Sequence, residues 1–497
     1  MWPFEPVPVM DPTSLLPTFM LGQLPDLPAC PSFSTILEWS NYDCNVKVAG
    51  FSVGFSMFAV IAFTCSVFAF ELMLDLRQRA VISSDEQPTK LYSVVGAIDA
   101  ADKTKKSNLK KQIMEKFVSS QAYGLDKINF SIFSQFYGLI EGCGFMLLGA
   151  YPYLWKLSID LGAKLSWTEA DEIKLSCLFF VLMTFAGEAT GLPLSIYSTF
   201  FLEKKHGFNK TTPKLFVKDK IQSIILTFAI GSPVLALLLY IVKSTGELFY
   251  LYAWALMFVF SVTMMTIYPA FIMPIFNKFD PLPEGDLKTS IEALASSINY
   301  PLTKLFIIDG SKRSSHSNAF MFGFGKNKRI VLFDTLMKQV TNDEILSILG
   351  HELGHWALSH TLVNFVVTQL YFGAAFFGYG LCLNTNYLYS AFGFDRDSVP
   401  TLISLILFML YFWAPLDKVI SFLLTINTRM AEFAADRYSI GLGMKTLQSG
   451  LTKIHIENLG SMKSDKWYST YHYSHPPLAE RLEAMAVEEK RVAGKSK

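Results

Sequence analysis

Seven long apolar stretches constrain the fold of this 497-residue chain more than any other feature. Each stretch is long enough for the roughly 20 residues that a bilayer core requires of a helix. Lone strands could not satisfy their backbone groups in lipid, so we expect helices. The charged fraction, 17%, also lies below the roughly 25% of ordinary soluble domains. The predicted spans lie near residues 48–73, 131–155, 174–200, 221–242, 249–274, 358–383 and 401–426.

The charge balance excludes one large class of function. The chain carries 43 basic and 42 acidic residues, a formal net charge of +1. A nucleic-acid-binding protein normally shows a basic excess or a basic face. We therefore predict that the chain has no nucleic-acid partner and that it is embedded in the lipid bilayer.

The loops between the spans predict the orientation of the chain in the membrane. The first loop carries ten basic residues between Arg77 and Lys127, and the third carries six between Lys204 and Lys220. The second, fourth and sixth loops carry only one or two each. Because basic loops stay in the cytosol, we expect a lumenal N-terminus and a cytosolic C-terminus. Four acids lie inside the spans and either pair with basic residues or face an internal polar space: Glu71, Glu141, Glu188 and Asp417.

A five-residue motif, His351-Glu352-Leu353-Gly354-His355, points to a metal site. Two histidines four residues apart share one face of a helix, so both imidazoles can reach one metal ion. Glu352 lies beside that ion, where it can take a proton from the attacking water. Thr341 precedes the acids of a first helical turn, which predicts that it caps this helix.

A pair of acids further along the chain, Glu432 and Asp436, can supply a third metal ligand. A catalytic zinc site needs three protein ligands and an open position. Glu432 can be the third ligand, and Asp436, on the same helix face, can accept the free N–H of a ligand histidine. The residues from Asp343 to Leu383 are predicted to form one continuous helix, about 60 Å long at 1.5 Å per residue. That is twice the thickness of the hydrocarbon core, so we expect the metal at or just outside the cytosolic membrane face.

Eight motifs together make the sequence similar to a known family, the type I CAAX prenyl proteases. These are integral-membrane zinc metalloendopeptidases that process prenylated C-termini. The resemblance covers nearly all of the chain after residue 48, and it implies seven helices around a large chamber with the zinc site at its cytosolic end. The motifs are GLPLSIYSTF (191–200), EKKHGFNK (203–210), DPLPEG (280–285), GSKRSSHSNAF (310–320), KNKRIVLFDTL (326–336), GHELGHW (350–356), EFAAD (432–436) and YSHPPLAERL (473–482).

The resemblance also implies roles for residues that the metal motif does not contain. Asn318-Ala319-Phe320 is similar to the edge segment that holds the substrate backbone, and Asn318 could polarise the scissile carbonyl; alternatively, it caps a turn. His475 is similar to a histidine that donates to the oxyanion; alternatively, it is a turn residue before two prolines. Arg481 would orient a site carboxylate or meet the terminal carboxylate of the substrate; alternatively, it forms a surface salt bridge. The remaining histidines considered are predicted to be structural or to lie at the surface: His206, His316, His360, His455 and His472.

These expectations define an all-α integral membrane protein with a small α+β zinc-protease region at the cytosolic face. Residues 287–298 are predicted as a helix, and Lys304–Ile308 and Arg329–Phe333 as strands. The predicted regions are a Pro-rich N-terminal segment (1–47), five transmembrane helices (48–274), a cytosolic loop region with the edge strand (275–345), the zinc site with two further helices (346–440) and a C-terminal region that completes the active site (441–497).

The resulting functional hypothesis is a protease that binds one Zn²⁺ and removes the C-terminal aaX tripeptide from prenylated CaaX proteins. The resemblance also implies a second, upstream cleavage in some relatives, and it places such enzymes in the endoplasmic reticulum membrane and in some cases the inner nuclear membrane. Two alternatives remain open: a general membrane quality-control metallopeptidase with no prenyl requirement, and a transporter or scaffold with a structural zinc.

Overall fold

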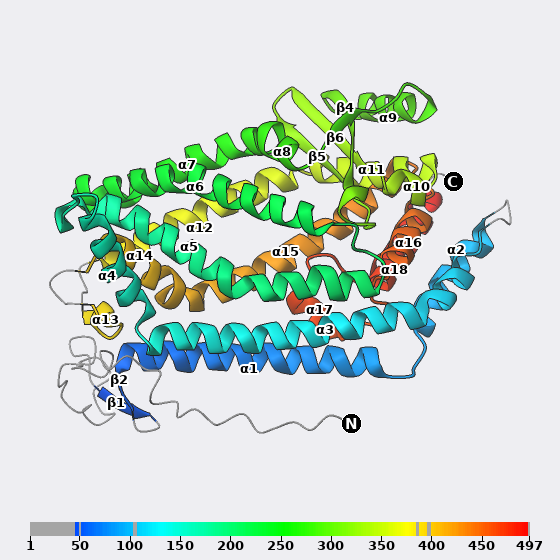
Figure 1. Cartoon of the computed structure of the whole chain (residues 1–497). Helices are drawn as coiled ribbons and strands as arrows, with labels where there is room; N and C mark the ends of the chain where they lie inside the picture. Colours follow the sequence, from blue (N-terminus) through cyan, green and yellow to red (C-terminus); the bar gives the residue numbers. More distant parts are fainter. Residues whose placement is uncertain (1–44, 49–50, 103–106, 384–386, 395–398, 496–497) are drawn as a thin grey trace.

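The computed structural model describes residues 45–48, 51–102, 107–383, 387–394 and 399–495 (Figure 1). Most of the predicted Pro-rich segment, 1–47, lies outside this range. Its last residues belong to a two-stranded antiparallel hairpin, β1 (Asn45–Val48) with β2 (Phe51–Gly54). The first membrane helix therefore begins at Phe55 and not near residue 48.

Seven spans can be counted within the described residues when each of two bent helix pairs is taken as one span. The pairs are α3 with α4, bent by 62°, and α14 with α15, bent by 57°. All seven predicted apolar stretches fall on these helices, which confirms a mostly helical membrane protein. The helices are α1 (Phe55–Ser83), α3 (Leu109–Leu147), α4 (Ala150–Ala163), α5 (Glu172–Tyr197), α6 (Pro213–Ser244), α7 (Phe249–Ile267), α12 (His360–Cys382), α14 (Thr401–Leu407) and α15 (Ala414–Gly441).

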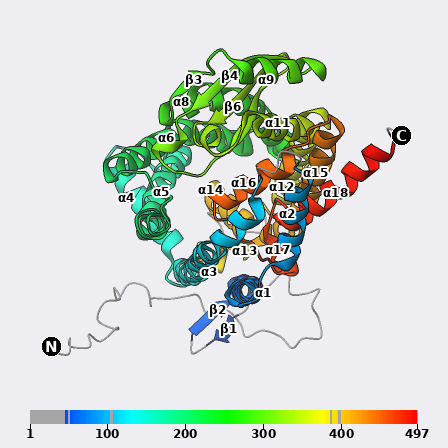
Figure 2. The same cartoon turned by 90° about the vertical axis from the view of Figure 1, so that its right-hand side faces the viewer.

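The spans form a ring that is one helix thick (Figure 2). Contacts run from α1 to α3, from α5 through α6 and α7 to α12, and from α15 through the short helix α17 (Lys466–His472) back to α1. On α6, Ile221 and Ile225 are exposed, and so are Ser223 and Thr227, which lie about 200° further round the helix. Helix α6 thus has two uncovered faces. The apolar face suits lipid and the polar face suits the interior of the ring, as the predicted chamber requires.

Three of the four acids predicted inside the spans have polar partners among the described residues. Glu71 pairs with Lys418 and Glu188 pairs with Lys220, each with a nitrogen–oxygen distance of 2.8 Å. Asp417 accepts a hydrogen bond from a tyrosine hydroxyl of α12 at 2.8 Å. The pairing interpretation is therefore confirmed for Glu71 and Glu188. These contacts hold neighbouring spans together and keep carboxylates away from lipid.

A four-stranded mixed sheet stands at one end of the ring. Its strand order is β3-β4-β6-β5, with β4 parallel to β6 and the outer pairs antiparallel. Near the end of β5, Gly323 has φ +117°, and a Cβ added there would lie 2.0 Å from the Asn327 carbonyl oxygen of β6, so this position requires glycine. The two predicted strands are confirmed. The strands are β3 (Phe279–Pro281), β4 (Leu302–Ile308), β5 (Ala319–Phe324) and β6 (Asn327–Phe333).

One apolar core joins this sheet to the helices around it. Val95, Ile113, Ile291, Leu353 and Leu482 are each exposed by less than 1% and belong to one cluster. They come from both halves of the chain, so α2 and the start of α3 pack with the sheet region. The predicted helix at 287–298 is confirmed as α9. The remaining helices are α2 (Thr89–Ala101), α8 (Met273–Phe276), α9 (Asp286–Ser297), α10 (Leu336–Gln339), α11 (Asn342–Ala357), α13 (Tyr387–Ser390), α16 (Leu447–Glu457) and α18 (Leu478–Lys495).

Candidate metal centre

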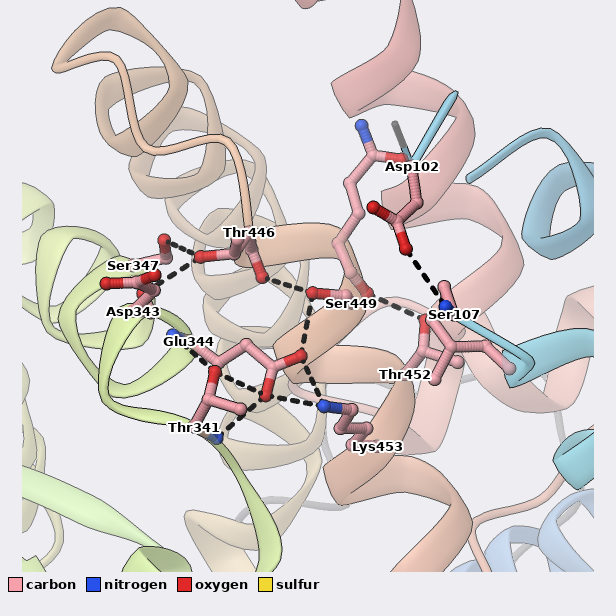
Figure 3. A network of polar contacts seen from close by, with 12 residues as sticks. Asp102, Ser107, Thr341, Asp343, Glu344, Ser347, Thr446, Ser449, Thr452 and Lys453 are labelled. Atoms are coloured by element: carbon pink, nitrogen blue, oxygen red, sulfur yellow. Dashed lines mark hydrogen bonds and ion pairs between the residues drawn. The ribbon is translucent and has the colours of Figure 1, made fainter. Parts of the chain in front are cut away.

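Helix α11 carries the predicted metal motif, and its first turn is braced by polar contacts (Figure 3). Thr341 is the N-cap as predicted: its hydroxyl accepts from the backbone N–H of Glu344, whose carboxylate accepts from the backbone N–H of Thr341 at 2.8 Å. The same carboxylate forms an ion pair with Lys453 of α16 at 2.8 Å and accepts from the Ser449 hydroxyl at 2.9 Å. This network fixes the beginning of α11 against α16.

Two glycines let α11 approach α15 closely. A Cβ built on Gly354 would lie 3.2 Å from the Cα and carbonyl oxygen of Ala435, and one built on Gly350 would lie 2.9 Å from the Ser439 hydroxyl oxygen. Larger residues would push the two helix backbones apart. The close approach brings Glu432, which lies on α15, to the face of α11 that carries the histidines.

Three side chains converge where these helices meet. His351 Nε2 lies 3.2 Å from His355 Nε2 and 3.5 Å from Glu432 Oε2, and His355 Nε2 lies 3.2 Å from Glu432 Oε1. One ligand atom from each residue lies within 4.8 Å of the other two. His351 is 5% exposed and Glu432 3%. The sequence prediction that two separate motifs meet in space is therefore matched by the geometry.

Asp436 and Arg481 contact the side of this cluster that faces away from the converging ligand atoms. Asp436 Oδ1 lies 2.9 Å from His351 Nδ1. Arg481 donates to both carboxylate oxygens of Asp436, at 2.7 and 2.8 Å, and its Nη1 lies 3.4 Å from Glu432 Oε2. Arg481 is only 8% exposed, so it orients a buried carboxylate and does not form the surface salt bridge of the alternative interpretation.

Burial and charge shift the protonation of the motif residues. Burial alone would lower the pKa of His351, but hydrogen bonds to Asp436 and Glu432 outweigh it and raise the pKa to about 9. A bound metal has to displace that proton. Burial raises the pKa of the Glu352 carboxyl, although the neighbouring histidines oppose the shift. A raised pKa suits a carboxyl that must both accept and return a proton near neutral pH.

His475 reaches the same cluster from the segment that follows α17. Its Nδ1 lies 2.9 Å from Glu432 Oε2, while its side chain remains 66% exposed. The ring therefore touches the metal-site carboxylate and also borders the solvent side, where a substrate would arrive. The position suits the predicted donor to a reacting oxygen.

The cluster fits one metal ion. Two imidazole nitrogens face each other at 3.2 Å beside a carboxylate. Glu432 Oε2 is buried and forms no well-directed hydrogen bond within the described residues, although His475 Nδ1 and Arg481 Nη1 lie 2.9 and 3.4 Å from it. A cation between these atoms would satisfy all three groups. Two histidines and one glutamate are a ligand set found in catalytic zinc sites.

Comparison with known proteins decides the family. Residues 101–278 match the family model "CAAX prenyl protease N-terminal, five membrane helices", and residues 281–489 match "Peptidase family M48". The "CAAX prenyl protease 1 homolog" of Arabidopsis thaliana is 43% identical over 437 residues, covering 88% of this chain and 98% of that protein. The chain belongs to the CAAX prenyl protease family. It is a multi-pass membrane metallopeptidase of the M48 type.

Other members of the CAAX prenyl protease family agree in sequence and in fold. The human "CAAX prenyl protease 1 homolog" is 40% identical over 466 residues, covering 86% of this chain and 94% of that protein. The crystal structure of S. mikatae Ste24p superposes with a TM-score of 0.76 at 37% identity, covering 86% of this chain and 98% of that one. The fold of this prenyl protease homologue is therefore that of a solved relative along most of its length.

The predicted substrate segment of this prenyl protease homologue lies at an edge of the sheet. β5 begins at Ala319, and no strand in the described part of the chain pairs with its outer edge. Asn318 is exposed; its Oδ1 accepts from the Ala319 N–H at 2.8 Å, and its backbone oxygen accepts from the Phe333 N–H. The side chain thus hydrogen-bonds to the first backbone N–H of β5, and both interpretations of Asn318 stay predictions. The free edge that binding would need is also present, and Phe320 follows within the same strand.

One part of the helix prediction was wrong. The helix predicted from Asp343 to Leu383 breaks at Ser359, whose φ is +58°, and continues as α12 from His360. The break brings His360 back to the site, with its Nδ1 3.0 Å from His355 Nδ1. His360 was predicted to be structural or to lie at the surface. In a continuous helix, the fifth residue after His355 would lie on another face. No glycine signals the left-handed residue.

Proposed function

We propose that this protein is a zinc endopeptidase that removes the C-terminal aaX tripeptide from prenylated CaaX proteins. The observation that carries the proposal is the convergence of His351, His355 and Glu432 where α11 meets the membrane helix α15, with the free edge of β5 nearby. Membership of the CAAX prenyl protease family supports the substrate class.

His351, His355 and Glu432 would hold the zinc ion, and Asp436 with Arg481 keeps His351 oriented. When bound, zinc supplies a Lewis acid that lowers the pKa of water at the site and polarises the scissile carbonyl. The protein's own residues then have three tasks: to transfer one proton, to stabilise one oxyanion and to position the peptide.

Glu352 moves the proton. Its carboxylate takes a proton from the attacking water and afterwards gives it to the leaving amine. The raised pKa makes this buried carboxylate a stronger base for the first step, and the protonated carboxyl that results is in place for the second. His475, exposed beside Glu432, donates to the oxyanion that forms at the former carbonyl.

The outer edge of β5 holds the substrate. An extended C-terminal peptide adds to the sheet beside Ala319 and Phe320, so that main-chain hydrogen bonds position it whatever its side chains. Asn318, at the exposed start of the strand, borders the scissile bond. The prenyl chain stays in the apolar core of the bilayer while the peptide reaches the metal.

The proposed location is the endoplasmic reticulum membrane, with the C-terminus in the cytosol. The orientation is supported by the concentration of lysines in the loops at the end of the ring that carries the sheet and α11 (Figure 1). Glycosylation acceptors placed in the loops test it: acceptors should be modified between α6 and α7 and remain unmodified between α1 and α3.

The deciding experiment combines metal analysis with matched peptides. The full chain, purified and reconstituted in nanodiscs, should contain one zinc per chain. It should cleave a farnesylated CaaX peptide after the modified cysteine. Mass spectrometry then compares this cleavage rate with the rate for a geranylgeranylated peptide. The same spectra would show a second, upstream cut as an additional N-terminal fragment.

The control is the same peptide without the lipid. Cleavage of the bare peptide should be at least about tenfold slower, because apolar burial of the prenyl chain contributes binding energy. Equal cleavage of both peptides would contradict the prenyl requirement and favour a general quality-control peptidase. Zinc without any proteolysis would instead favour a transporter or scaffold with a structural metal.

A further inference from the structure

The break between α11 and α12 creates a contact that a continuous helix forbids. Residue i+5 of an α-helix lies about 140° round the axis from residue i, so His360 could not reach His355. At Ser359 the chain adopts φ +58°, a region that non-glycine residues adopt only at a cost in free energy. Helix α11 ends with the Leu358 N–H on the Gly354 carbonyl, and α12 restarts with the Val363 N–H on the Ser359 carbonyl. The result is the 3.0 Å distance between His360 Nδ1 and His355 Nδ1.

The geometry of His355 determines which nitrogen must carry its proton. Nε2 of His355 faces the other two ligands, at 3.2 Å from His351 Nε2 and 3.2 Å from Glu432 Oε1. A neutral imidazole that binds metal through Nε2 has its hydrogen on Nδ1. That hydrogen points to His360 Nδ1, which can accept it when the proton of His360 is on Nε2. His360 thus selects the tautomer of His355 that binds metal.

His351 has the same kind of support from a different residue. Its Nδ1 lies 2.9 Å from Asp436 Oδ1, and Arg481 fixes that carboxylate with two hydrogen bonds. Each ligand histidine therefore has an acceptor close to the nitrogen that faces away from the metal. The partner of His351 is a charged carboxylate of α15, and the partner of His355 is an imidazole at the start of α12.

We propose that His360 is a positioning residue of the metal site. It accepts the Nδ1–H of His355, holds that ring with Nε2 toward the ion, and so increases metal affinity. The proposal rests on the metal site of the proposed function and concerns how tightly that site binds zinc. The left-handed turn at Ser359 is the structural device that brings the acceptor into place.

Two variants distinguish the effect of the hydrogen-bond acceptor of His360 from the effect of its ring. His360→Phe keeps an aromatic ring of similar size but cannot accept a hydrogen bond, whereas His360→Asn places an amide oxygen near the position of Nδ1. Zinc content is measured on the full-length protein in nanodiscs after equilibration with graded concentrations of a chelator. We expect His360→Phe to bind zinc about 10- to 100-fold more weakly, and His360→Asn to remain within about threefold of the unmodified protein. Equal zinc affinity in His360→Phe, or an equal loss in both variants, would overturn the acceptor role.

The turn provides a second, independent pair of variants. Ser359→Gly tolerates a positive φ and should leave zinc affinity unchanged. Ser359→Val, whose branched side chain disfavours that conformation, should weaken zinc binding in the same direction as His360→Phe. Unchanged affinity in Ser359→Val, with the protein still folded by its thermal unfolding midpoint, would contradict the role of the turn.

Cobalt substitution tests whether His360 binds metal itself. Visible absorption of Co²⁺ depends on the number and kind of ligands, so His360→Asn should leave the spectrum unchanged. A changed spectrum would show that His360 is a ligand and would refute the positioning role.

His351→Ala is the control for the site as a whole: the unmodified chain should bind zinc and this variant should lose it. Failure of that control would contradict the proposed function, whereas failure of the His360 variants alone would not.

Discussion

The α11–α15 pair and the ring of membrane spans are packed in contrasting ways. At the pair, His351, Glu432 and Asp436 are at most 5% exposed, and each has close polar partners. In the five unbroken spans, only 6–22% of the residues in the most apolar window are buried. Metal ligands must be held within about half an ångström of their working positions, whereas a one-helix wall needs only apolar faces of sufficient length. The contrast predicts that equal substitutions have unequal effects in the two regions.

The largest difference is expected for a glutamate-to-glutamine change. Glu352→Gln removes the proposed proton carrier and should lower the rate of peptide cleavage by about 10²- to 10⁴-fold, with zinc retained. Glu188→Gln, in the ring, replaces a carboxylate that pairs with Lys220 and should change the rate by less than about twofold. Both rates are measured on the farnesylated peptide, and unchanged activity in Glu352→Gln would refute the assigned base.

Removal of one cation should show the next largest difference. Arg481→Met leaves the buried Asp436 without its two hydrogen bonds and should destabilise the protein by about 3–5 kcal/mol. Lys220→Met breaks a pair in which both side chains are about one-third exposed, and should cost less than about 1 kcal/mol. The thermal unfolding midpoints of the two variants provide the comparison. Similar midpoints would mean that the α11–α15 region is no more sensitive than the ring.

Two glycine-to-alanine changes test the packing without changing charge. Gly354→Ala would place a Cβ 3.2 Å from the Ala435 backbone, and overpacking of this kind costs about 1–3 kcal/mol. It should also lower zinc affinity, because α15 carries Glu432. Gly187→Ala, in α5, meets nothing within 4 Å and should be neutral or slightly stabilising, since alanine favours helices. A neutral Gly354→Ala variant would remove the argument for close helix approach.

The smallest expected effect is a dependence of stability on pH at the start of α11. Burial raises the pKa of Glu344, but Lys453, the Thr341 backbone and Ser449 outweigh it and hold the pKa below its usual value. A lowered folded-state pKa stabilises the protein above the unfolded-state pKa, and this stabilisation is lost as the pH falls through the folded-state value. The slope from one such group is at most about 1.4 kcal/mol per pH unit.

Comparison with Glu344→Gln isolates that slope. The variant should lose stability less steeply on acidification below about pH 4.5, because the difference in protonation between the folded and unfolded states is gone. The measurement is the thermal unfolding midpoint across the acidic range. Parallel curves for both proteins would show that the Glu344 network does not respond to pH.

Sequence patterns predicted the elements that depend on local spacing. Apolar length located the spans, and the motif from His351 to His355 located two neighbouring side chains, because four residues bring a helix back to the same face. Thr341 was predicted as an N-cap because its hydroxyl competes locally for the first free N–H groups. The same reasoning failed at Ser359, which adopts a left-handed conformation that non-glycine residues disfavour.

The sequence by itself therefore determined how many segments can cross a bilayer, that two imidazoles and a glutamate share one helix turn, and that the family's motifs are present. Only the tertiary structure decided that Glu432 reaches these imidazoles across a glycine-lined contact, that Arg481 is buried against Asp436, and that His360 turns back to His355. The physical reason is the distance along the chain over which each kind of interaction acts. Periodicity along the chain dictates which residues share a face, whereas contacts between distant segments depend on how closely whole helices approach and where one of them breaks.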